Sequence, residues 1–142
     1  MGVIERISIL AKDVVKLGDN AERLLQLARA HAEFLPAVSI HPARPDALEE
    51  LDRSLAAGAV MMKCLPNCQN IDWNNPRYTR FLERMAASGL ILLAHTGSER
   101  TLPVIDARLA DPRVLTRALE IGVTCIAAHC GTGMMVIDRD YF

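Results

Sequence analysis

Residues 89–97 read Gly-Leu-Ile-Leu-Leu-Ala-His-Thr-Gly, and this stretch decides the fold class. An apolar run lies between a glycine and a polar His-Thr-Gly end, which is typical of a short strand buried on both faces. The segment before it, 75–88, opens with Asn-Pro and carries apolar residues at helical spacing. A helix that leads into such a strand predicts a parallel sheet covered by helices.

The same helix-to-strand pattern occurs on both sides of this stretch. We expect helices over 19–34, 46–58, 75–89 and 111–122. We expect strands over 37–41, 59–65, 90–94 and 123–128. Residues 4–17 fit either a strand or a helix, and 68–75 and 98–111 are expected to be long polar loops. The prediction is therefore one α/β domain over residues 1–142, built of parallel β/α repeats.

Composition excludes several classes of function. The chain has 16 Lys and Arg against 17 Asp and Glu, so it lacks the basic surface that nucleic acid or an anionic membrane requires. No apolar run approaches the roughly 20 residues that span a bilayer, and no secretory signal is visible. Four cysteines in 142 residues are too few for a disulfide scaffold. We expect a cytoplasmic protein with reduced thiols.

Three of the four histidines occupy the same position in the repeat. His41, His95 and His129 each end a predicted strand, and Lys63 lies late in the remaining one. Because parallel strands end at a common edge, we expect these side chains at the edge where α/β proteins bind ligands. Glu99, two residues beyond the glycine that follows His95, is a candidate to orient or pair with a site group.

Each of these residues also has a structural explanation. His41 suits a hydrogen-bonded loop anchor, Lys63 suits a lysine that extends out of an apolar strand, and Glu99 suits a surface carboxylate. The pair His95 and His129 is more specific, because both follow strands in adjacent repeats and both precede small or glycine residues. Neutral imidazole is the commonest metal ligand, so the pair predicts a shared divalent ion.

Two alternatives stay open at this point. The cysteines loosely resemble two halves of a structural zinc site, although their spacing is wrong for a tight knuckle. They are Cys64, Cys68, Cys125 and Cys130. The other alternative is a complete flavodoxin-like domain, which would carry a phosphate-binding loop after its first strand. No such loop follows 37–41 or 59–65.

Four motifs, taken in order, resemble the amidohydrolase superfamily of metal-dependent hydrolases, and most of all its amidohydrolase-related branch, which also contains decarboxylases. They are Ser39–Pro42, Gly58–Pro66, Leu92–Gly97 and Ala127–Gly131. The resemblance covers about residues 35–133. It implies a (β/α)8 TIM barrel, in which the strands recognised here are roughly the third to the sixth.

The resemblance also implies a catalytic centre. In the family, histidines of strands five and six bind the catalytic divalent metal, and His95 and His129 match those positions. Zinc is the first candidate for that metal. Some members carry a carboxylated lysine on strand four that bridges two metals, whereas others keep an ordinary lysine, and Lys63 matches that strand. The implied catalytic residues are thus His95, His129 and Lys63, with His41 and Glu99 as substrate-binding candidates.

The sequence departs from the family in two places. The family takes further ligands from a His-x-His on its first strand, and no two histidines here are two residues apart. It takes a catalytic Asp from its eighth strand, whereas Phe142 follows soon after the sixth. Since a full barrel needs about 250 residues, we expect an incomplete barrel fragment.

Two function hypotheses follow from the resemblance and its departures. The leading one is metal-dependent hydrolysis of a small-molecule amide, ester or lactone, or a related decarboxylation. The alternative is a non-catalytic barrel remnant whose open sheet edges mediate self-association. Because apolar strands with too few partners leave surface to cover, we expect a homo-oligomer.

Overall fold

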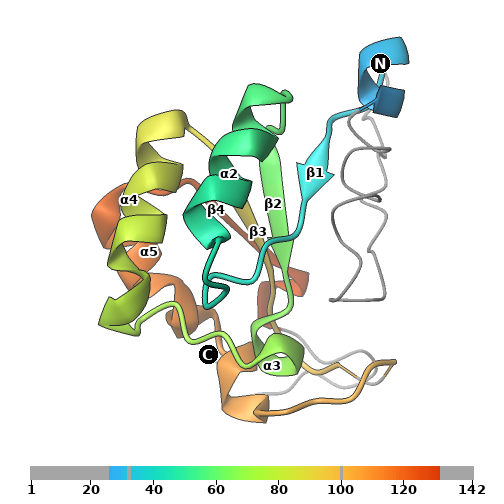
Figure 1. Cartoon of the computed structure of the whole chain (residues 1–142). Helices are drawn as coiled ribbons and strands as arrows, with labels where there is room; N and C mark the ends of the chain where they lie inside the picture. The colour runs from blue at the N-terminus through green and yellow to red at the C-terminus, as the bar shows by residue number, and fades with distance from the viewer. Residues whose placement is uncertain (1–25, 32, 100, 132–142) are drawn as a thin grey trace.

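The protein, studied as a computed structural model that describes residues 26–31, 33–99 and 101–131, is built around a parallel sheet. Its strands follow one another in chain order without reversal (Figure 1). They are β1 (Ala37–Val38), β2 (Met61–Cys64), β3 (Ile91–His95) and β4 (Cys125–Ala128). Every neighbouring pair is parallel, so the predicted parallel α/β class is confirmed.

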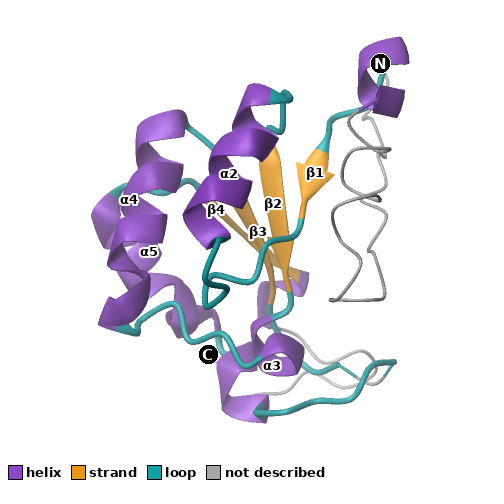
Figure 2. Cartoon of the chain, in the orientation of Figure 1, coloured by secondary structure: helices purple, strands orange, loops and turns teal. Residues whose placement is uncertain are grey.

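The helices gather on one side of this sheet. Figure 2 shows α2, α4 and α5 together on that side, with α3 beyond the carboxyl end of β2. The helices are α2 (Ala47–Ala56), α3 (Pro66–Gln69), α4 (Thr79–Ser88) and α5 (Thr116–Ile121). Short 3-10 turns are η1 (Pro76–Tyr78), η2 (Ala107–Ala110), η3 (Pro112–Leu115) and η4 (His129–Gly131). In the part of the chain that the structure describes, no helix is long and apolar enough to cross a bilayer.

Strand alternation separates the core from the opposite face of the sheet. Met62 and Leu92 are partners in register and belong to the buried core beneath the helices. Successive residues of a strand point to opposite faces, so Lys63, Leu93 and His95 point away from the helices. The chemistry-bearing residues of β2 and β3 are therefore on the face that the described helices leave open.

The helices contribute their apolar stripes to the same core. Leu51 of α2, Leu82 and Met85 of α4 and Ala118 of α5 have no exposed surface. Helix α4 ends at Gly89, whose φ of 70° is the left-handed conformation that suits glycine at this position. The chain then enters β3 directly, which carries His95 to the end of the sheet.

The first predicted helix and strand are corrected by the structure. Residues 26–30 are helical, His31 lies just beyond them, and positions 19–25 and 4–17 are outside the described residues. Strand β1 has only two residues, so the prediction that His41 ends a strand is wrong. The chain already turns at His41, because the Arg44 amide donates to the His41 carbonyl over 3.1 Å.

The predicted loops also contain local structure. Pro66, expected to close a strand, instead starts α3, because proline is tolerated in the first turn of a helix. Asn70, with a left-handed φ of 55°, ends that helix after one turn. The loop 98–111 contains η2, where the Asp106 side chain accepts from the Arg108 amide over 3.0 Å. These turns are too short to show a helical period in the sequence.

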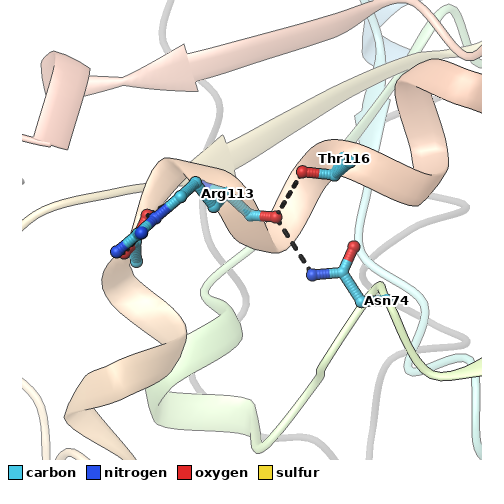
Figure 3. A network of polar contacts seen from close by, with 4 residues as sticks. Asn74, Arg113 and Thr116 are labelled. Carbon is cyan, nitrogen blue, oxygen red and sulfur yellow. Dashed lines mark hydrogen bonds and ion pairs between the residues drawn. The ribbon is translucent and has the colours of Figure 1, made fainter.

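A polar network joins the loop before α4 to the start of α5 (Figure 3). The Asn74 side-chain amide donates to the Arg113 carbonyl over 3.0 Å, and the Thr116 hydroxyl donates to the same oxygen over 2.8 Å. The Arg117 backbone amide donates to Asn74 Oδ1 over 3.1 Å. Asn74 thereby supplies a partner for an amide in the first turn of α5, which the helix itself cannot provide.

The buried thiol of Cys64 predicts a loss of stability in alkali. Burial raises its pKa to about 12, from an ordinary value of 9.0. Above pH 9 the thiol therefore ionises in the unfolded chain but not in the folded protein, and each pH unit lowers the free energy of unfolding by about 1.4 kcal/mol. Chemical denaturation under reducing conditions, from pH 8 to about pH 10, measures this. Cys64→Ala should lose less stability than the wild type over that range. If the variant and the wild type lost the same stability, the raised pKa assigned to the Cys64 thiol would be wrong.

Candidate functional site

The site is centred on two histidines at the carboxyl ends of β3 and β4. His95 is the last residue of β3 and pairs in register with Ala128, the residue before His129. The two ring centroids lie 4.9 Å apart, with the ring planes inclined at 60°. His95 is buried and His129 is exposed. The structure thus brings together two imidazoles that lie 34 positions apart in the sequence.

The hydroxyl of Thr96 joins the ends of these two strands. It donates to the Ala128 carbonyl over 2.7 Å and accepts from the Gly131 amide over 3.0 Å. Thr96 is completely buried. Its two hydrogen bonds join the residues on either side of a tight turn, in which His129 and Cys130 both have positive φ, at 66° and 50°. Such conformations are costly for residues other than glycine, and the two bonds from Thr96 stabilise the turn that positions His129.

Glu99 reaches His95 from the loop after β3. Its Oε2 lies 3.9 Å from His95 Nε2, and its side chain is only 10 % exposed. The other carboxylate oxygen, Oε1, accepts from both the backbone amide and the hydroxyl of Thr101, each over 2.5 Å. The carboxylate is therefore oriented with one oxygen held by the loop and the other toward the imidazole.

The environment keeps His95 neutral. Burial lowers the pKa of its imidazole, and the charges of His129 and Lys63 lower it further, whereas Glu99 acts in the opposite direction. Its Nε2 is buried and makes no hydrogen bond with any described residue. A buried ring nitrogen without a partner is rare in proteins, and a ligand is one of the explanations for it. His95 can offer that nitrogen to a metal or a substrate.

Lys63 and Cys68 lie in the field of the same carboxylate. Burial lowers the pKa of the Lys63 amine, and the charge of Glu99 partly opposes this. Burial raises the pKa of the Cys68 thiol, and Glu99 raises it further. Lys63, Cys68 and His95 come from β2, α3 and β3, so Glu99 interacts with groups from three separate elements. From the sequence, Cys68 was considered only in the zinc-site alternative and not as a neighbour of Glu99.

His41 and Asn67 have different surroundings. His41 Nε2 lies 2.9 Å from the Gln69 carbonyl, and its Nδ1 accepts from the Ala43 amide over 3.1 Å. Both ring nitrogens thus contact backbone groups, which is the anchor role expected for His41 as its structural explanation.

Asn67 is fully buried, and neither side-chain amide atom has a partner among the described residues. Its carbonyl accepts from the amides of Ile105 and Asp106, which ties the 98–111 loop to α3.

The described residues fit part of a divalent metal site. The free Nε2 of His95 suits a metal ligand, and the His129 ring and the Glu99 carboxylate are near it. Within the described ranges, however, no three His, Cys, Asp or Glu side chains are grouped to hold a metal ion. The four cysteines, all described, form no disulfide. Because they are also not grouped to hold a metal ion, the zinc-knuckle alternative has no support.

Comparison with known proteins places the chain in a family. No curated protein matches it. Residues 5–138 match the family model described as amidohydrolase, which covers nearly the whole chain and includes both histidines of the site. The chain therefore belongs to the amidohydrolase family.

Proposed function

We propose that the protein acts as a metal-dependent hydrolase on a small-molecule amide, ester or lactone. The observation that carries this proposal is the pairing of His95 and His129 at the carboxyl edge of a parallel sheet. This edge is where β/α barrels place their catalytic groups. The unreversed strand order suits an arc of such a barrel, whereas a doubly wound domain reverses its strand order.

In this proposal His95 and His129 are ligands of a divalent cation, with zinc as the first candidate. When bound, such an ion polarises a carbonyl and makes hydroxide available near neutral pH. The lowered pKa of His95 keeps its imidazole in the neutral form that can bind a metal. Glu99, held by Thr101, has its Oε2 3.9 Å from His95 Nε2 and so supplies a negative charge beside the cation. Lys63 supplies a hydrogen-bond donor for the substrate oxygen from the neighbouring strand.

The proposal is tested by zinc binding and hydrolysis in the same set of variants. The chain is loaded with zinc, and hydrolysis of p-nitrophenyl acetate and a panel of simple lactones and amides is measured. His95→Ala and His129→Ala should each lower bound zinc and reduce zinc-dependent hydrolysis by at least about 100-fold. His31→Ala is the matched control, because His31 contacts Phe34 and lies outside the site. Equal hydrolysis by the wild type and His95→Ala would refute the proposal.

Self-association is a second candidate function, favoured by exposed apolar surface on the sheet face opposite the described helices. Ile126 of β4 is 42 % exposed there, and β1 and β4 each have one strand partner among the described residues. A second copy that covered this face would bury apolar surface and pair the strand edges. Sedimentation velocity over a range of concentrations decides the matter: a dimer supports this candidate and a strict monomer removes it.

A further inference from the structure

An open pocket lies between the starts of α2 and α4, outside the histidine site. Its volume is about 310 Å³, at the lower end of the range for small-molecule sites. Three arginines line it: Arg44 precedes α2, Arg77 belongs to η1 and Arg80 lies in the first turn of α4. None of the described residues that line the pocket belongs to the histidine site, so a ligand bound here is a separate one.

Two of the three arginines carry a charge that no carboxylate neutralises. Arg44 is paired with Asp46, whose two oxygens accept its guanidinium hydrogen bonds over 2.9 and 2.7 Å. The Arg77 guanidinium lies 4.5 Å from the centroid of the Tyr78 ring and donates to the Tyr78 hydroxyl. Within the ranges 26–31, 33–99 and 101–131, neither Arg77 nor Arg80 is paired with a carboxylate. Their guanidinium groups can therefore bind an anion that enters the pocket.

The position of these two arginines is unfavourable without an anion. The N-terminus of a helix carries a partial positive charge, which favours acidic residues there and disfavours basic ones. The first turn of α4 contains no acidic residue, and Arg77 and Arg80 are only three positions apart. Like charges at this spacing repel each other. An anion bound between them relieves this repulsion and is attracted by the helix N-terminus as well.

One carboxylate that lines the pocket, Glu49 in the first turn of α2, acts in the opposite direction. Because the charges of Arg44 and Asp46 cancel, those of Arg77 and Arg80 exceed that of Glu49 by one positive charge. Glu49 is exposed, so water weakens its repulsion of a ligand. The pocket as a whole therefore still favours a negatively charged ligand.

We propose that this pocket binds the phosphate group of a small phosphate monoester. A carboxylate has two oxygens and one charge, whereas the phosphate group has three acceptor oxygens and nearly two charges. Phosphate can therefore accept from Arg77 and Arg80 at once, and the planar guanidinium fork matches its geometry. Phe81 and Leu48, which belong to the apolar core or pack against it, line the same pocket and suit the organic part of the ligand.

Isothermal titration of the zinc-free chain with phenyl phosphate tests the proposal, because no metal at the histidine pair can then bind the phosphate. We expect one phenyl phosphate per chain and at least about tenfold weaker binding of benzoate, which makes fewer charge-assisted hydrogen bonds. Arg77→Gln and Arg80→Gln should each weaken phenyl phosphate binding at least about tenfold. Both arginines are exposed, so circular dichroism should show the fold retained. Glu49→Gln should strengthen binding roughly two- to fivefold.

Arg84→Gln is the matched control, because Arg84 lies on the same helix but pairs with Asp52 and does not line the pocket. It should bind phenyl phosphate as the wild type does. The proposal is overturned if the wild type does not bind phenyl phosphate, or if Arg77→Gln and Arg80→Gln bind it as tightly as Arg84→Gln. Equal affinity for benzoate would overturn the assignment to phosphate. These results do not involve zinc or hydrolysis, so failure here differs from failure of the hydrolase proposal.

Discussion

Replacing Trp73 with alanine is expected to lower the free energy of unfolding by about 3–5 kcal/mol, the usual cost of removing a large buried aromatic side chain. Trp73 has no exposed surface. Its ring stacks on Phe81 with centroids 6.2 Å apart and lies 5.9 Å from the Tyr78 ring. Its Nε1 donates to the Cys64 sulfur over 3.3 Å, so it also joins the 70–75 loop to β2.

Chemical denaturation of Trp73→Ala and two controls measures this effect. Trp73→Phe keeps an aromatic ring and loses the bond to Cys64, so it should cost about 1–2 kcal/mol. Phe34→Ala removes a ring that is 51 % exposed and should change stability by less than about 0.5 kcal/mol. If Trp73→Ala cost no more than Phe34→Ala, the packing described around the indole would be wrong.

Replacing Thr96 with valine is expected to cost about 2–4 kcal/mol, although the two side chains have nearly the same shape. The substitution removes the hydroxyl that joins the Ala128 carbonyl to the Gly131 amide. The Gly131 amide is then left buried without this partner, and an unsatisfied buried group costs about 1–3 kcal/mol. The positive-φ turn at His129 also loses its support, so zinc affinity should fall by about 10–100-fold.

Thr96→Ser is the matched control for this prediction, because serine keeps the hydroxyl and loses only a methyl group. It should retain most of the stability and of the zinc affinity. Thr116→Val removes an exposed hydrogen bond to the Arg113 carbonyl, which still accepts from Asn74, and should cost about 0.5 kcal/mol or less. Equal stability of Thr96→Val and Thr96→Ser would contradict the assigned role of the hydroxyl.

Periodicity predicted the central repeats of the fold well. The run before His95 and the helix that ends at Gly89 have strong patterns, and both elements were found close to their expected bounds. Around His41 the same reasoning failed, because a short apolar run beside a proline does not reveal how many residues pair with a neighbouring strand. Pro66 was misread for a related reason, since proline both stops strands and starts helices.

The candidate site was only partly accessible from sequence. Strand ends placed His95 and His129 at one edge, because parallel strands share their direction. The bonds of Thr96 and the contact of Glu99 with His95 depend on how loops close over that edge. The conformation of a loop follows no repeating sequence pattern, so composition and residue spacing do not predict these contacts. The sequence feature that could have directed attention to Thr96 is a hydroxyl residue directly after a histidine at a predicted strand end.

The most direct test of the shared role of His95 and His129 follows the imidazole nitrogens of the chain's four histidines by NMR as zinc is added. We predict that the resonances of these two rings change together and reach saturation at one zinc ion per chain, while those of His31 stay unchanged. Separate responses at different zinc concentrations, or no response from either ring, would contradict a common site at the end of β3 and β4.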